Sequence, residues 1–222
     1  LRRWYSGEGV DWDNLKIQDI IKNQHCNIFP DAKVQTHNHH LSHAAAGFQT
    51  SPFDRATVVV IDAIGEWDTI SIWHAYFDDR GYAQYQKLWG QQYPHSVGLM
   101  YSAFTKKAGL KPLEEEYILM GLSSYGKYDS LRQMNFNHKI IADDQDVTFK
   151  HNFHLGVPDS IDVPLRGEDM AFAVQELTEE LISSIMLKAQ HLGVSNNLVY
   201  MGGVALNCVA NRMLGEYYDN IR

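Results

Sequence analysis

The sequence has few of the features that mark secreted or membrane-bound proteins. Only two of its 222 residues are cysteines, Cys26 and Cys208, and they lie far apart outside any Cys-x-x-Cys motif. This usage predicts reduced thiols in a cytoplasmic protein. No apolar run approaches the roughly 20 residues of a membrane-spanning helix, and the sequence shows no signal peptide. We therefore expect no membrane association.

Basic residues are also scarce, since 19 Lys and Arg stand against 27 Asp and Glu, for a formal net charge of -8. General nucleic-acid or anionic-membrane binders need clustered Lys and Arg, so no nucleic-acid partner is expected. The Gly-x-Ser-x-Gly and His-Glu-x-x-His motifs of two large hydrolase classes are absent as well. A hydrophobic content of 45% in 222 residues nevertheless allows a sizeable core.

The apolar pattern predicts an α/β fold. Before residue 56 it predicts a short amphipathic helix at 14–23, a brief strand at 33–37 and a helix at 39–48. The order predicted after that is strands at 56–62, 69–76 and 82–89, a helix capped by Ser96, an irregular stretch at 111–128, a polar segment at 129–166, a helix at 168–192, a strand at 197–201 and a helix at about 207–218.

This order matches one half of a ribonuclease-H-like, actin-like ATPase fold, a mixed sheet flanked by helices. We predict a remnant of a first actin-like subdomain at 1–55 and a second subdomain at 56–222 with an insertion near 110–166. The chain begins at Leu1 and ends where a new strand is expected to start. We therefore interpret it as a fragment truncated at both ends.

The stretch from Thr36 to Asp62 concentrates residues that can do chemistry. Four histidines fall within seven positions: His37, His39, His40 and His43. On a helix, His39 and His43 point the same way, about 5–6 Å apart at Cβ. Asp62 ends a predicted buried strand, where α/β sheets place their ligands. Two histidines and a carboxylate leave open coordination positions and suit Fe²⁺, Zn²⁺ or Mn²⁺.

An alternative without a metal is a histidine-rich surface helix beside an Asp62 that has a structural role. In either case His37 and His40 would lie on other faces of the helix, either next to the site or in solvent.

Two glycine turns are candidate ligand-binding loops. Gly65 would let backbone amides approach a phosphate, although an ordinary hairpin turn explains it equally well. Gly202 and Gly203 lie between a strand and a helix, whose N-terminus favours anions. This loop lacks the lysine of a Walker motif and is as consistent with a packing turn. Cys208 at the start of the last helix is predicted to be a buried small hydrophobe.

Four segments together resemble the NodU/CmcH-type O-carbamoyltransferases, which modify nodulation factors and antibiotics. They read HHLSHAAAGFQTSPF, VVVIDAIGEW, GLMYSAFTKKAGL…EEEYILMGLSSYG and YMGGVALNCVANRML, and they span residues 39 to about 215. The resemblance implies an actin-like domain that binds a metal, typically iron, together with an adenine nucleotide. It also implies a separate domain that makes carbamoyl-adenylate from carbamoyl phosphate and ATP, before the carbamoyl group moves to a substrate hydroxyl.

Carried onto this chain, the resemblance implies that the metal ligands are His39, His43 and Asp62. It implies that the nucleotide-binding residues are Gly65, Glu66, Gly202, Gly203, Val204 and Asn207. It implies that the residues lining the site include Glu116, Tyr117 and Gly121. The implied partners are carbamoyl phosphate, ATP and a hydroxyl-bearing small molecule or sugar, with a homodimer as a candidate assembly. The general base is not identifiable from the sequence.

Three residues depart from the family pattern. Ala63 stands where a glycine usually follows the strand-end aspartate, Ile118 replaces a lysine, and Ser124 replaces a proline. Two rival interpretations therefore stay open. One is a tRNA threonylcarbamoyl-transferase-like enzyme, which shares the fold and the histidine pair. The other is a degenerate nucleotide-binding actin-like module, which Ala63 and Ile118 favour.

The resemblance also predicts that these 222 residues cannot complete the reaction alone. The N-terminal strands, a further metal-binding aspartate and the adenylate-forming domain would all lie outside the chain. We expect no carbamoyl transfer when the purified chain is supplied with carbamoyl phosphate, ATP and a hydroxyl acceptor. Detection of a carbamoylated product by mass spectrometry would contradict this.

Overall fold

The computed structural model describes residues 17–31, 33–127, 129–163, 166–193 and 195–222. The chain divides into two compact units, residues 1–38 and 39–222. In the described part of the chain, no helix combines the length and apolar character needed to cross a bilayer.

The smaller unit contains helix α2 (Ile17–Ile28). The helix predicted at 14–23 is confirmed over 17–23 and continues for five further residues, whereas 14–16 lie outside the described residues. The strand predicted at 33–37 is wrong, because the described residues of this segment pair with no other strand. Backbone groups in such a segment gain no ladder hydrogen bonds, so local β-propensity alone does not make a strand.

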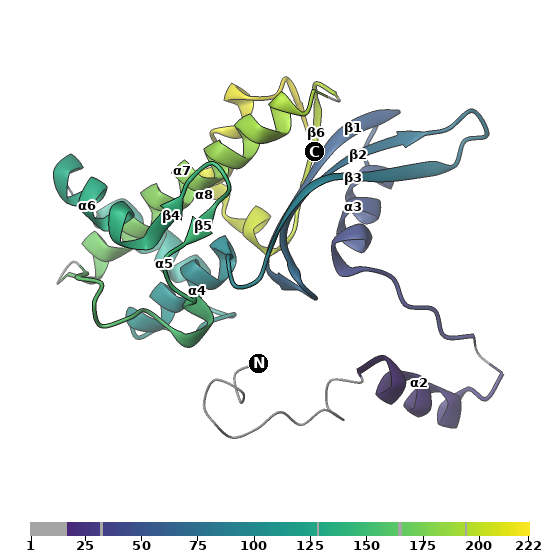
Figure 1. The fold of residues 1–222 in the computed structure, drawn as a ribbon, viewed down its shortest axis with the longest axis horizontal. Coiled ribbons are helices and arrows are strands. Elements are labelled where there is room, and N and C mark those ends of the chain that lie inside the picture. The colour runs from purple at the N-terminus through teal and green to yellow at the C-terminus, as the bar shows by residue number, and fades with distance from the viewer. Residues whose placement is uncertain (1–16, 32, 128, 164–165, 194) are drawn as a thin grey trace. The chain divides into compact units, whose positions relative to one another are not determined.

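The larger unit is built on a five-stranded sheet in the order β3-β2-β1-β6-β7 (Figure 1). Its strands are β1 (Arg55–Gly65), β2 (Asp68–Phe77), β3 (Ala83–Gln92), β6 (Asn197–Met201) and β7 (Asn220–Ile221). The first three form an antiparallel meander, as predicted, while β6 runs parallel to β1 and β7 runs parallel to β6. The predicted mixed sheet flanked by helices is therefore confirmed.

Strand β1 is central because its β-branched run is buried on both faces. Val59 and Ile61 pack into one core with helices α4 (Val97–Lys107) and α7 (Gly167–His191). Val58 and Val60 pack into a second core with Phe48 of helix α3 (His39–Gln49). A continuous apolar run of this kind is typical of a strand covered by helices on both sides.

The predicted helices on either side of this strand are confirmed. Helix α3 ends before Pro52, which restricts the preceding residue to extended conformations. Ser96 caps α4, because its hydroxyl accepts a hydrogen bond from Leu99 N–H at 3.0 Å. The same hydroxyl donates to the Ala63 carbonyl at 2.6 Å, so the cap also ties α4 to the end of β1. In α7, the side chains at three- and four-residue steps are buried.

Three predictions for the second half of the chain need correction. The stretch 111–128 is not wholly irregular, since it contains helix α5 (Glu116–Leu122). Its acidic run supplies acceptors at the start of that helix: Glu115 Oε2 takes the Lys111 N–H at 2.7 Å and Glu116 Oε1 takes the Leu113 N–H at 2.6 Å. The polar segment after it forms α6 (Ser130–Ile140) and a hairpin of β4 (Ile141–Asp143) and β5 (Thr148–Phe149).

The last predicted helix is the second correction, because α8 covers only Cys208–Asn211 before a separate 3-10 turn at Leu214–Glu216. Gly215 disfavours a continuous helix there.

Cys208 is the third correction: its thiol is free but exposed, because the short α8 lies at the surface. The side chain of Cys26 lies outside the described part. The proposed subdomain division between residues 55 and 56 stays a prediction.

His95 ties the β4–β5 hairpin to the sheet and should make stability depend on pH. Its Nδ1 accepts a hydrogen bond from Phe149 N–H at 3.0 Å, which requires a neutral ring. Burial lowers the pKa of His95 below its ordinary value of 6.5. Below pH 6.5, His95 therefore binds a proton more readily in the unfolded chain than in the folded chain. Its contribution to the free energy of unfolding is complete above that pH and declines as the pH falls.

His95→Asn keeps an acceptor oxygen near the Nδ1 position but cannot titrate. We expect its free energy of unfolding, measured in urea, to fall less than that of the wild type between about pH 7.5 and about pH 5.5. Identical pH dependence in the two proteins would contradict this assignment.

Candidate metal centre

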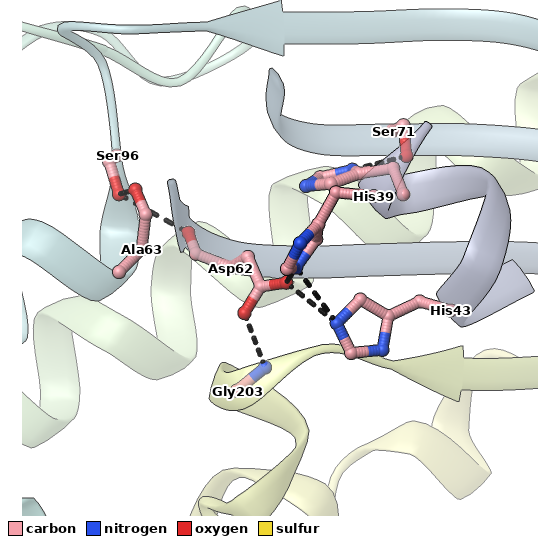
Figure 2. A network of polar contacts seen from close by, with 8 residues as sticks. His39, His43, Asp62, Ala63, Ser71, Ser96 and Gly203 are labelled. Atoms are coloured by element: carbon pink, nitrogen blue, oxygen red, sulfur yellow. Dashed lines mark hydrogen bonds and ion pairs between the residues drawn. The ribbon is translucent and has the colours of Figure 1, made fainter. Parts of the chain in front are cut away.

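His39, His43 and Asp62 converge near the carboxyl end of the central strand β1 (Figure 2). Helix α3 begins at His39, which places His39 and His43 one turn apart on the same face. Asp62 lies near the end of β1, where the pairing with β2 changes register between Ile61 and Gly65. The change in register is a local irregularity of the kind that redirects a side chain at a strand end.

His39, His43 and Asp62, hereafter the His-His-Asp group, bring three ligand atoms together. Asp62 Oδ2 lies 3.1 Å from His39 Nε2 and 3.0 Å from His43 Nε2, and the two nitrogens are 3.1 Å apart. Among the described residues this is the one cluster of His, Cys, Asp or Glu side chains with metal-ligand geometry. The side chains of His39, His43 and Asp62 are 45%, 32% and 14% exposed, so the group is accessible from one side.

The second glycine loop holds the Asp62 carboxylate in this orientation. Gly203 N–H donates to Asp62 Oδ1 at 2.7 Å, which leaves Oδ2 facing the histidines. Gly202 has a φ of 97°, and a Cβ there would lie 2.3 Å from the Ile61 carbonyl oxygen. Only glycine fits this approach. The N–H of Gly203, a residue assigned to nucleotide binding from the sequence, thus donates to Asp62 in this structure.

Behind the group, His40 is completely buried. Its Nδ1 lies 2.6 Å from Ser71 Oγ, which also accepts a hydrogen bond from Trp73 Nε1 at 2.7 Å. Burial lowers the pKa of His40 to about 4, so its ring is neutral at neutral pH. The sequence left two places open for the His40 side chain, next to the site or in solvent, and the side chain lies next to the site. His37 is exposed.

Gly65 has a packing role in this structure. A Cβ at position 65 would lie 2.3 Å from His40 Cδ2 and 2.8 Å from His39 Cδ2. Any side chain would therefore push both rings away from the end of β1. The predicted contact of this turn with a phosphate stays a prediction.

A pocket of about 390 Å³ adjoins the His-His-Asp group, and its lining includes Asp62 and the Gly203 that holds this carboxylate. Of the other residues assigned to the site from the sequence, those lining the pocket are Glu116, Tyr117, Val204 and Asn207. Those that do not line it are Gly65, Glu66, Gly121 and Gly202. The nucleotide-binding and site-lining roles themselves stay predictions.

Several pocket residues were missed from the sequence. Tyr101 and Ser102 of α4 line the pocket, as does Thr178 of α7. The Tyr101 hydroxyl donates to Gln175 Oε1 at 3.0 Å, and burial raises the pKa of Tyr101. All three lie on helices whose periodicity is that of core elements, so no local motif distinguishes them from packing residues.

The fold and the His-His-Asp group define an α/β protein with a candidate metal centre at the end of its central strand. A family model described as "Carbamoyltransferase N-terminus" matches residues 12–219. The chain therefore belongs to this carbamoyltransferase family, and the family assignment made from the four sequence segments is confirmed.

The chain is similar to several curated proteins. An uncharacterized protein of Synechocystis is 39% identical over 199 residues, covering 80% of this chain and 31% of the relative. An uncharacterized protein of Methanocaldococcus jannaschii is 26% identical over 82% of this chain and 33% of the relative. The nodulation protein NolNO of Sinorhizobium fredii is 24% identical over 82% of this chain and 27% of its own length. The chain thus spans about a third of the length of the relatives it matches.

Gly65→Ala tests whether packing behind the histidines sets the geometry of the group. The added methyl group would displace His40 or His39, so we expect a loss of about 1–3 kcal/mol in the free energy of unfolding. We also expect affinity for added Co²⁺ to fall by about 10- to 100-fold. Gly121→Ala is the matched control, because nothing lies within 4 Å of a Cβ there. Similar Co²⁺ titration curves for Gly65→Ala and Gly121→Ala would contradict the packing role.

Proposed function

We propose that the protein carrying this chain is an O-carbamoyltransferase. It moves a carbamoyl group from carbamoyl-adenylate, made from carbamoyl phosphate and ATP, to a hydroxyl of a small molecule or sugar. Family membership supports a transferase, and the observation that carries the proposal is the His-His-Asp group beside a pocket in a chain of this family. The similarity to a nodulation protein favours this assignment over a tRNA-modifying enzyme.

The strand arrangement supports the ribonuclease-H-like, actin-like ATPase fold. A meander of β1, β2 and β3 continues on the other side of β1 with the parallel strands β6 and β7. This is the arrangement expected of one half of such a fold. In parallel sheets, ligands bind at the carboxyl ends of the strands, where Asp62 and Gly203 lie.

The geometry of the His-His-Asp group fits a divalent metal. Ligand atoms about 2.1 Å from one ion are about 3.0 Å apart along an octahedral edge and about 3.4 Å apart in a tetrahedron. The separations of 3.0 and 3.1 Å therefore fit three ligands of one divalent ion. Two histidines and one carboxylate on one face are the ligand set of non-haem Fe²⁺ sites. Fe²⁺ is thus our first candidate, ahead of Mn²⁺ and Zn²⁺.

The chain's own residues have defined roles in this proposal. His39, His43 and Asp62 would hold the metal, and Gly203 keeps the carboxylate turned toward it. A metal bound there would supply a Lewis acid beside the pocket. The apolar side chains of Met120 and Val204 would exclude water from the carbamoyl group of the bound carbamoyl-adenylate. The cytoplasmic location inferred from cysteine usage remains a prediction.

Metal analysis of the purified chain tests the proposal. We expect about one equivalent of iron after anaerobic loading with Fe²⁺, and less than about a tenth of that in His39→Ala/His43→Ala, because both ring ligands are lost. The matched control is His37→Ala/His138→Ala, which removes two exposed histidines. Equal iron content in the two double variants would contradict the site.

The full-length protein then tests the reaction. It should release pyrophosphate when given carbamoyl phosphate and ATP, and AMP once a hydroxyl acceptor is also present, and Asp62→Asn should reduce carbamoyl transfer to that acceptor by at least about 100-fold. Transfer at wild-type rate in Asp62→Asn would refute the proposed role of the centre.

A further inference from the structure

A buried glutamine of α7 lies behind the pocket without lining it. Gln175 is 3% exposed and belongs to the buried face of this helix. Its side chain bonds to Tyr101 of α4, to Asn207 after β6 and to Glu179 one turn further along α7. The pocket lining includes Tyr101 and Asn207 but not Gln175. An effect of Gln175 on a ligand would therefore be transmitted by these two neighbours.

The side-chain amides of Gln175 and Asn207 exchange two hydrogen bonds. Gln175 Nε2 donates to Asn207 Oδ1 at 3.1 Å, and Asn207 Nδ2 donates to Gln175 Oε1 at 3.0 Å. The Tyr101 hydroxyl also donates to Gln175 Oε1, at 3.0 Å. Two amides paired in this way have a defined orientation only where further partners distinguish the oxygen of each amide from its nitrogen.

Two groups with a single hydrogen-bonding role fix that orientation. The Ala210 N–H can only donate, and it meets Asn207 Oδ1 at 3.1 Å. The Glu179 carboxylate can only accept, and its Oε1 lies 2.9 Å from Gln175 Nε2. Arg212 Nη2 binds the other oxygen of Glu179 at 3.1 Å. Turning either amide over would place donor against donor and acceptor against acceptor, so α7 determines the orientation of Asn207.

Asn207 ends the same loop that holds the Asp62 carboxylate. The loop after β6 forms a 3-10 turn, Gly203–Leu206. Gly203 N–H at the start of the turn donates to Asp62, and Asn207 directly after the turn pairs with Gln175. The turn is thus fixed to β1 at one end and to α7 at the other. Both Gly203 and Asn207 were assigned to nucleotide binding from the sequence.

We infer that Gln175 is a positioning residue for the nucleotide part of carbamoyl-adenylate. It orients the Asn207 amide and holds the far end of the glycine loop against α7, without touching the ligand itself. This role rests on the proposed carbamoyl transfer and adds to it a residue that lies in a core helix.

AMP is the probe, and it is titrated into the full-length protein loaded with one equivalent of Co²⁺. Paramagnetic broadening of the AMP phosphorus resonance reports AMP bound near the metal. The Zn²⁺-loaded protein is the diamagnetic reference, because AMP bound elsewhere is broadened equally in both samples. Dissociation constants for AMP come from the difference between the two titrations.

Gln175→Met keeps a side chain of similar length but offers no N–H donor and only a weak acceptor. We expect AMP affinity to fall by at least about 10-fold, because the Asn207 amide loses its fixed orientation. Affinity for Co²⁺ should change by less than about threefold, since the histidines and Gly203 still hold Asp62. Wild-type AMP affinity in Gln175→Met would overturn the inference.

Gln133→Met is the matched control for lost hydrogen bonds in the core. Gln133 of α6 is also buried, at 9% exposed, and its Nε2 donates to Asn137 Oδ1 and to the Ala173 carbonyl, both at 2.9 Å. It does not line the pocket, so its AMP affinity should stay within about twofold of the wild type. Equal losses of AMP affinity in Gln133→Met and Gln175→Met would assign the effect to general destabilisation and overturn the positioning role.

An exchange of side chains provides a second test should Gln175→Met fail to fold. Gln175→Glu removes the donor to Asn207 and places two carboxylates side by side, so AMP affinity should again fall by at least about 10-fold. In Gln175→Glu/Glu179→Gln the amide at 179 can donate to the new carboxylate, and AMP affinity should return to within about threefold of the wild type. A double variant as weak as Gln175→Glu would count against the network.

Pyrophosphate release from carbamoyl phosphate and ATP is measured on the same wild-type samples. If pyrophosphate is released and AMP binds near the metal, but Gln175→Met binds AMP as the wild type does, the positioning role fails and the proposed function stands. If the wild type neither releases pyrophosphate nor binds AMP near the metal, the proposed function fails, and the positioning role fails with it.

Discussion

The hydrogen bond from Gly203 N–H to Asp62 Oδ1 is the contact on which the candidate site depends. It joins the loop after β6 to the end of β1, and it can form because these strands run parallel with Val60 opposite Met201. The bond turns the other carboxylate oxygen toward the two histidines of α3. One carboxylate oxygen of Asp62 contacts the loop after β6 and the other contacts the histidines of α3, so this single side chain connects the loop and the helix.

Small residues make this convergence sterically feasible. Gly202 allows the loop to lie against the Ile61 carbonyl, and Gly65 leaves space for His40 behind the group. Gly98 of α4 approaches Ala63 so closely that a Cβ would lie 2.8 Å from its Cα. At each of these positions the absence of a side chain leaves room for a neighbouring group near Asp62. The loop after β6, helix α3 and helix α4 can therefore lie close to the end of β1.

Local sequence patterns predicted the parts of the fold that depend on neighbours along the chain. The i, i+4 spacing of His39 and His43 sufficed to place their rings together, because a helical turn brings such residues to one face. The stretch at 111–128 was predicted to be irregular, but Glu116 begins helix α5 and its Oε1 accepts the Leu113 N–H. Cys208 was predicted to be buried, but a helix of only four residues leaves it exposed.

The sequence by itself determined the candidate metal-binding residues, the central buried strand, the meander and the family. Only the tertiary structure decided that Gly203 orients Asp62, that His40 packs behind His39, and that Ser102 holds Glu116 in the pocket wall. The contacts of Gly203 with Asp62, of His40 with Gly65 and of Ser102 with Glu116 each join residues of different elements. Periodicity reports which face of an element is buried, whereas the pairing register of β1 and β6 and the packing of α4 against α5 decide which side chains meet.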